Sequence, residues 1–173
     1  MRELIIPNGI TGVGGHANES IQCLRLSDTV IRLENSAFMD CIDLETVYWG
    51  ANIISGGSRI FYNCKNIKKV YVNSEEDFFK YICDNFGSPL QYGADLYIGD
   101  KLCTEISVPR DLLSEYRLYN FLGCGSVKKF KVWEDTPFYQ KICDMIEDIN
   151  TNKDKFRYFT DGDIQDIELE VLR

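Results

Sequence analysis

The stretch Leu44–Val72, LETVYWGANIISGGSRIFYNCKNIKKVYV, decides the fold of this chain. It holds two copies of an apolar triple, and a third copy precedes it at the same 23-residue step. The three copies are Ile21-x-x-Leu24-x-Leu26, Leu44-x-x-Val47-x-Trp49 and Ile67-x-x-Val70-x-Val72. A fixed period of this length predicts a solenoid, because stacked units bury together the apolar face that no unit can bury alone.

Further units lie on both sides of this stretch. The first, from Ile6 to Leu26, is three residues shorter, and the last, Val108–Val132, is one residue longer. Residues 61–84 also align with 121–144 at a constant offset of 60. We expect a single repeat domain over residues 1–173. Its predicted parts are N-terminal repeats (1–72), a helix and hairpin insert (73–103), the last repeat (104–132) and a C-terminal helix with an acidic cap (133–173).

Two helices and one hairpin interrupt the repeats. Ser74 and Asp77 form a capping box pattern before a helix that carries Phe78 and Phe79. Leu96–Leu102, with Gly99-Asp100 at its centre, predicts a small hairpin. Thr136-Pro137 predicts the cap and first residue of the second helix. The apolar face of that helix is predicted to be Phe138, Ile142, Met145, Ile146 and Ile149.

These patterns resemble the BspA-type leucine-rich repeat family over residues 4 to 132. The resemblance lies in the 23-residue step and in three segments: Ile6-Pro7-Asn8-Gly9-Ile10, Ser36-Ala37-Phe38-x-x-Cys41-x-x-Leu44, and Ser88–Tyr97 running on to Pro109. Two later copies of the second segment depart from this pattern, because Ile60 and Asn120 stand where the segment has Ala37. The resemblance implies an α/β, β-rich fold, a short leucine-rich-repeat solenoid of about 23-residue units with two inserted helices and an acidic C-terminal cap. It further implies binding of other macromolecules through the strand-lined face, and no catalytic residues.

Charge and hydropathy exclude several function classes. The net charge of -8 argues against non-specific binding to DNA, RNA or an anionic membrane as the main activity. No signal-peptide pattern opens the chain, and no apolar run approaches membrane-spanning length. We therefore expect a cytoplasmic protein, although a secreted protein trimmed of its signal has the same appearance.

The seven cysteines and the single histidine give no catalytic or metal-binding pattern. No C-x-x-C pair is present, and Cys41, Cys64 and Cys124 share one register of the repeat. That regularity favours buried thiols in equivalent core positions over metal ligands. His16 lies in a glycine-rich loop, and no motif links it to a serine or cysteine nucleophile. We expect no enzyme and no cofactor.

The strand face offers the main candidate site, which would bind another protein. Residues that alternate with the buried ones point outward, and tyrosine and long cationic side chains recur at interfaces. The opposing interpretation, that lysines keep the exposed strands soluble, stands equally open. The predicted partner-binding residues are Arg25, Tyr48, Tyr71, Lys68, Lys69, Lys128 and Lys131.

The acidic C-terminal segment supports an alternative of a different class. A small acidic chain could be a phage-encoded inhibitor of a bacterial nucleic-acid enzyme, such as a defence nuclease, in the manner of an anti-CRISPR protein. Its carboxylates would occupy the basic groove of the enzyme as a phosphate backbone does. The residues of this alternative surface are Asp161, Asp163, Asp166, Glu168 and Glu170.

Overall fold

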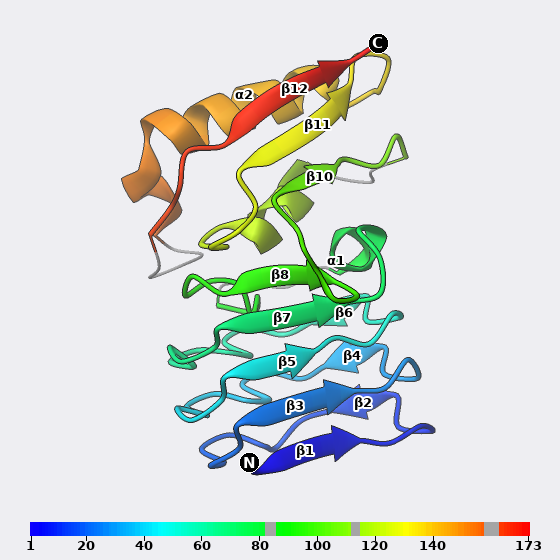
Figure 1. Cartoon of the computed structure of the whole chain (residues 1–173), viewed down its shortest axis with the longest axis vertical. Coiled ribbons are helices and arrows are strands. Elements are labelled where there is room, and N and C mark those ends of the chain that lie inside the picture. Colours follow the sequence, from blue (N-terminus) through cyan, green and yellow to red (C-terminus); the bar gives the residue numbers. More distant parts are fainter. Residues whose placement is uncertain (82–85, 112–114, 158–162) are drawn as a thin grey trace.

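Stacked parallel strands run through most of the chain in the computed structural model, which describes residues 1–81, 86–111, 115–157 and 163–173. The larger sheet has six strands, with the two ends of the chain at opposite ends of the stack (Figure 1). In spatial order these strands are β1 (Glu3–Ile6), β3 (Cys23–Leu26), β5 (Thr46–Tyr48), β7 (Lys69–Val72), β8 (Asp95–Ile98) and β9 (Lys101–Leu102).

The register of this sheet confirms the 23-residue solenoid. Leu24 pairs with Val47, and Val47 pairs with Val70, each in parallel. All three side chains are fully buried. The short first unit is confirmed as well, because Ile6 pairs with Leu26. The apolar residues therefore repeat at the same interval that separates paired residues on neighbouring strands.

A second, narrower ladder closes the other side of each turn. It consists of β2 (Gly12–Val13), β4 (Arg32–Leu33) and β6 (Ser55–Gly56) and lies behind the main sheet in Figure 1. Between the two ladders, side chains at equivalent positions of successive repeats stack on one another. The ring centroids of Phe38 and Phe61, for example, are 5.5 Å apart. The thiols of Cys41 and Cys64 are fully buried beside them, and Cys124 is buried in the later corner. This confirms that these cysteines fill equivalent core positions.

The main sheet ends because β9 folds back onto β8. The two strands form the predicted hairpin, in which Tyr97 pairs with Leu102. The hydrogen-bonding edge of β8 is then occupied, so the next repeat starts a separate sheet. That sheet contains β10 (Glu105–Ser107), β11 (Lys129–Trp133) and β12 (Glu168–Leu172), all parallel. A hydrogen bond still connects the two sheets, because the backbone amide of Leu96 in β8 donates to Ser126 Oγ, which precedes β11, at 2.9 Å.

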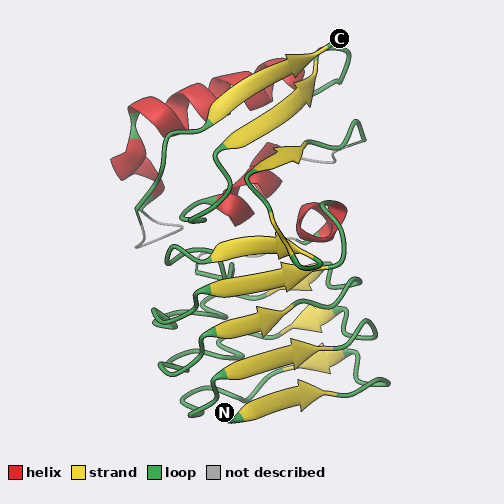
Figure 2. Cartoon of the chain, viewed as in Figure 1, coloured by secondary structure: helices red, strands yellow, loops and turns green. Residues whose placement is uncertain are grey.

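The helices of the described chain all follow β7 (Figure 2). They are α1 (Glu76–Lys80), η1 (Glu115–Phe121), α2 (Tyr139–Thr151) and η2 (Lys153–Phe156). At α1 the Asp77 carboxylate accepts from the backbone amide and the hydroxyl of Ser74, both at 3.0 Å, which is half of the predicted capping box. None of the described helices has the length and apolar character needed to cross a membrane.

The second helix begins two residues later than predicted. Its first residue is Tyr139, and the Thr136 hydroxyl donates to the Trp133 carbonyl rather than accepting from a helix amide. Thr136 therefore closes the turn after β11 instead of capping α2. The apolar face itself was predicted correctly, since Ile142, Met145, Ile146 and Ile149 are buried and Phe138 packs against the core.

Candidate binding surface

One column of outward-facing side chains crosses all six strands of the main sheet. Each member pairs with the next through the strand register. In order from β1 to β9 this outer column is Ile5, Arg25, Tyr48, Tyr71, Tyr97 and Leu102. Ile5 and Leu102 at its ends are 56% and 42% exposed, so a continuous, largely uncharged strip lies on the surface.

The three tyrosines of the outer column stack on one another. Tyr48 and Tyr71 have ring centroids 4.7 Å apart and ring planes 10° apart. Tyr71 and Tyr97 follow at 4.9 Å and 26°. These distances equal the spacing of neighbouring strands, which means that the ladder itself sets the stack. The inner ring faces are covered by neighbouring tyrosines and Arg25 lies over the outer face of Tyr48, so the surface presents mainly ring edges and phenol hydroxyls.

Arg25 extends the aromatic stack by one strand. Its guanidinium lies 3.6 Å from the centre of the Tyr48 ring, and its Nε donates to Glu3 Oε1 at 2.6 Å. The Arg25 hydrogen bond lowers the pKa of the Glu3 carboxyl. Burial, followed by its hydrogen bond to Glu3, raises the pKa of the adjacent Cys23 thiol to about 11. Arg25 is therefore held over the Tyr48 ring, with 42% of its side chain exposed.

The rim of the outer column differs on its two sides. On the side where the strands begin, Lys68 Nζ lies 3.4 Å from Glu45 Oε2 and Lys69 Nζ lies 6.0 Å from the Tyr97 ring centre. On the side where they end, Gly50 has no room for a side chain, because an added Cβ would lie 2.4 Å from the Ser27 carbonyl oxygen. The side where the strands begin therefore carries Lys68, Glu45 and Lys69, and on the other side a glycine is required at position 50.

The structure does not bring Lys128 and Lys131 to this surface. Lys131 lies in β11 of the second sheet, where its Nζ is 2.5 Å from Glu105 Oε1, and Lys128 immediately precedes that strand. That hydrogen bond raises the pKa of Lys131 and lowers the pKa of Glu105. Lys128 is half-buried, and its backbone bridges Thr104 and Glu168. The seven predicted residues therefore divide into five on the main sheet and two on a separate one.

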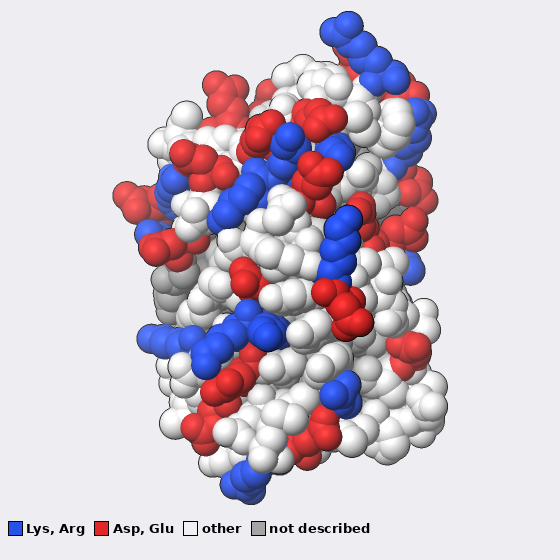
Figure 3. Space-filling model, in the orientation of Figure 1, with Lys and Arg blue, Asp and Glu red and all other residues white. Residues whose placement is uncertain are grey.

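Three carboxylates of the acidic segment are paired with lysines of the same chain. Lys129 Nζ lies 3.0 Å from Glu168 and 3.6 Å from Glu170, and Lys153 Nζ lies 2.6 Å from Asp166. Asp163 is exposed, and Asp161 lies outside the described residues. Figure 3 shows the result, with positive and negative side chains interspersed over β11 and β12 and an uncharged area over the middle of the main sheet. Nothing here favours mimicry of a phosphate backbone.

The histidine and the thiols are not arranged as a reaction centre in the described residues. His16 Nδ1 lies 2.9 Å from Glu19 Oε1, and the ring stacks on Phe38. Cys41 donates to the backbone carbonyl of His16 at 3.1 Å, and its side chain is fully buried. Burial also raises the pKa of Cys103 to about 12. In the described part of the chain, no three His, Cys, Asp or Glu side chains gather to hold a metal ion.

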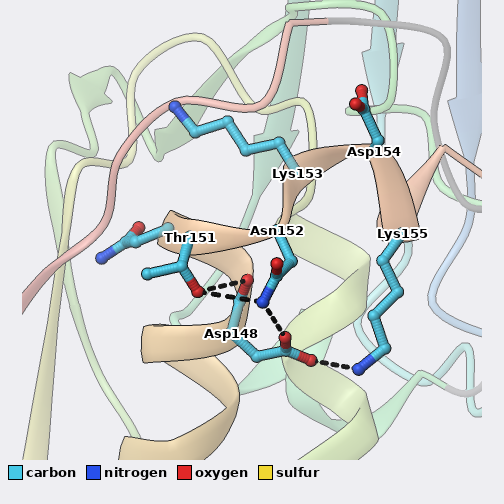
Figure 4. Close-up of a pocket in the computed structure, with 7 residues that line it drawn as sticks. Asp148, Thr151, Asn152, Lys153, Asp154 and Lys155 are labelled. Atoms are coloured by element: carbon cyan, nitrogen blue, oxygen red, sulfur yellow. Dashed lines mark hydrogen bonds and ion pairs between the residues drawn. The ribbon is translucent and has the colours of Figure 1, made fainter.

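A polar hollow at the end of α2 is part of the helix terminus (Figure 4). Its lining side chains bind one another, as when Asn152 Nδ2 donates to Asp148 Oδ1 at 2.8 Å and Lys155 pairs with the same carboxylate. Thr151 Oγ1 donates to the Glu147 carbonyl at 2.8 Å. These contacts close the last helical turn, as polar groups at a helix end generally do. The hollow is thus accounted for without a ligand.

Tyr97 is one of three members of the outer column that sequence reasoning missed. It follows Tyr71 by three more residues than the regular step, because residues 73–94 add a helix and loop to that turn. The available signal was the alternation in Asp95–Ile98, where buried Leu96 is flanked by the outward Asp95 and Tyr97. Ile5 and Leu102, at the ends of the column, were also missed.

The comparisons identify the repeat type. Residues 1–86 match the BspA type leucine rich repeat region in six copies. No curated protein and no solved structure matches the chain. The family match confirms the resemblance as far as residue 86. Its extension to residue 132 stays a prediction.

Proposed function

This chain belongs to the BspA-type leucine-rich repeat family over residues 1–86, and we propose that it binds a protein partner with the outer column of its main sheet. Leucine-rich repeat solenoids generally mediate protein–protein interaction and are typically not enzymes. The observation that carries the proposal is the partly exposed stack of Tyr48, Tyr71 and Tyr97 next to Arg25.

The composition of this strip suits a protein interface. Tyrosine and arginine are among the residues that most often dominate binding energy, and they do so near the centre of a contact area. Here the tyrosines occupy the middle strands and the exposed apolar residues, Ile5 and Leu102, occupy the ends. On the second sheet, by contrast, Lys129 and Lys131 are engaged with glutamates.

The stacking also argues against ligands that need an aromatic face. Nucleic acid bases bind aromatic side chains by lying on the ring, and the inner ring faces of this stack are covered by neighbouring tyrosines. Ring edges and hydroxyls are suited to the mixed apolar and hydrogen-bonding contacts of a protein surface. The proposed partner is therefore a protein.

Site-specific crosslinking tests the proposal. A photoreactive phenylalanine analogue replaces Tyr71 in one version of the full chain and Trp133, on the second sheet, in a control version. Each is irradiated in a lysate of the source cells. We expect a discrete protein adduct at position 71 that Tyr48→Ala abolishes, and no equivalent adduct at position 133. Equal labelling at both positions, or an adduct indifferent to Tyr48→Ala, contradicts the proposal.

A further inference from the structure

We propose that the partner seated on the outer column is a second copy of this chain, packed face to face about a two-fold axis that runs parallel to the strands between β5 and β7. This inference rests on the proposed function, since it names what the column binds. It is carried by the order of the residues in the column, which is nearly the same when read from either end.

The outer column is self-complementary about its centre. Rotation about the axis between β5 and β7 places Tyr48 against Tyr71 of the second copy. It likewise places Arg25 against Tyr97, and Ile5 against Leu102. Each pair joins groups that attract one another: two aromatic rings, a cation with an aromatic ring, and two exposed apolar side chains. A two-fold interface requires this kind of reciprocity, because each patch must fit itself.

The charges on the rim follow the same symmetry. Glu45 immediately precedes β5 and Lys68 immediately precedes β7, on either side of the proposed axis. The rotation brings Glu45 of each copy opposite Lys68 of the other. Both side chains are about half exposed or more and already lie 3.4 Å apart within one chain. In the dimer the four groups would form one alternating network, in which each carboxylate lies between two ammonium groups.

The spacing of the column also suits a second sheet. The ring centroids lie 4.7 and 4.9 Å apart, which is the spacing between neighbouring strands of a β-sheet. They therefore match the strand spacing of a second sheet whose strands run parallel to these. Packed sheets usually cross at about 30°, so the register is best at the axis and loosens toward the ends. Tyr48 and Tyr71 lie on the two strands beside the axis and Glu45 and Lys68 immediately precede these strands, and these four residues are expected to contribute most to the affinity.

Charge-reversal variants of the full chain test this arrangement. Sedimentation is measured between roughly 1 and 500 µM. The range extends to high concentration because interfaces that bury much less than about 800 Å² per partner are generally weak. We expect the wild type to dimerise, and Glu45→Lys and Lys68→Glu to dimerise at least about tenfold more weakly, since each places like charges across the axis. An equimolar mixture of the two variants should recover the dimer. In the mixed pair each introduced charge faces an opposite one, because the new lysine of one variant lies across from the new glutamate of the other.

The control is Glu105→Lys, which makes the same charge change in an ion pair on the second sheet and should leave dimerisation unchanged. A wild type that stays monomeric over the whole range overturns the inference. So do single variants that dimerise like the wild type, or a mixture that fails to recover. An adduct at position 71 containing a different protein would then still support the proposed function, so the two failures can be told apart.

Discussion

The phenol rings of Tyr48 and Tyr71 lie face to face at 4.7 Å on neighbouring strands, although both remain partly exposed to solvent. Each ring limits the rotation of the other, and Arg25 holds the free face of Tyr48. A surface that is ordered before its partner arrives loses less side-chain entropy on binding. The rigidity of this strip is a property of the folded chain, and stability measurements can test it directly.

Tyr71 should contribute more to stability than Tyr97, because Tyr71 stacks on two rings and Tyr97 on one. Each aromatic pair contributes about 0.5–1.5 kcal/mol beyond the burial of its area. We expect Tyr71→Ser to lower the free energy of unfolding by about 1–3 kcal/mol and Tyr97→Ser by about half as much. Urea unfolding of the two variants checks the order, and a larger loss for Tyr97→Ser would contradict the stacked arrangement.

Gly50→Ala should destabilise the solenoid where Gly12→Ala does not. A Cβ at Gly50 would lie 2.4 Å from the backbone oxygen of Ser27, and backbone atoms cannot move aside as a side chain tip can. A Cβ at Gly12 would meet only the end of Arg32, at 3.7 Å. We expect a loss of about 2 kcal/mol or more at Gly50 and little change or slight stabilisation at Gly12, measured as unfolding midpoints. Equal midpoints for the two variants would refute the close approach at Gly50.

Asn120 should be essential for the junction between α1 and η1. Its buried amide donates to the Phe78 carbonyl at 2.9 Å and to the Tyr81 carbonyl at 2.8 Å. Asn120→Leu keeps the volume but leaves these buried carbonyls without that donor, at a cost of about 2–4 kcal/mol. The matched control is Asn66→Leu, since Asn66 donates to the Ile42 carbonyl at an exposed site and should lose about 1 kcal/mol or less. Similar losses at both positions would argue against this function of Asn120.

The fold could be predicted largely because the stride of the apolar residues is the stride of the ladder. Leu24, Val47 and Val70 share the regular step and pair across neighbouring strands. Asn120 marks the limit of that reasoning. Asn120 stands at the repeat position of Ala37 and is likewise buried. Its amide, however, donates to the carbonyls of Phe78 in α1 and of Tyr81, the residue after α1. Periodicity alone does not reveal such a contact.

The candidate site could be predicted only in part, for two physical reasons. Register is countable along regular repeats, which is why Arg25, Tyr48 and Tyr71 were found on one face. The inserted helix hides the equivalence of Tyr97 with Tyr71. The hairpin strand β9 then ends the sheet, and one of the two strand partners of β11 comes from residues 168–172. No pattern in the sequence indicates that Glu105 would engage Lys131.

The buried thiols should resist alkylation in the folded protein. Only the thiolate reacts, and a pKa of about 11 for Cys23 reduces its thiolate fraction about 100-fold relative to an ordinary thiol at pH 8. Cys143, which is half-buried, should react first among the described cysteines. Peptide mapping after iodoacetamide treatment tests this, with urea-denatured protein as the control. Rapid native modification of Cys23 would contradict its burial.

The same thiols should make the fold less stable in mild alkali. Burial raises the pKa of Cys23 to about 11 and of Cys103 to about 12, from an ordinary value of 9.0. The folded state therefore binds these protons more tightly than the unfolded state. The stabilisation is complete below pH 9 and is lost as the pH rises toward 11 or 12. Between pH 9 and 10 each thiol should lower the free energy of unfolding by up to about 1 kcal/mol.

Other side chains also ionise near pH 10, so the contribution of each thiol is isolated by comparing a variant that lacks it with the wild type. The measurement is urea unfolding at pH 8, 9, 9.5 and 10, with Cys23→Ala and Cys103→Ala as the variants. Each variant also loses packing, and this loss lowers the free energy of unfolding by the same amount at every pH. The slope between pH 9 and 10 should be shallower in each variant than in the wild type. Parallel curves for all three proteins would show that ionisation of Cys23 and Cys103 is not linked to folding.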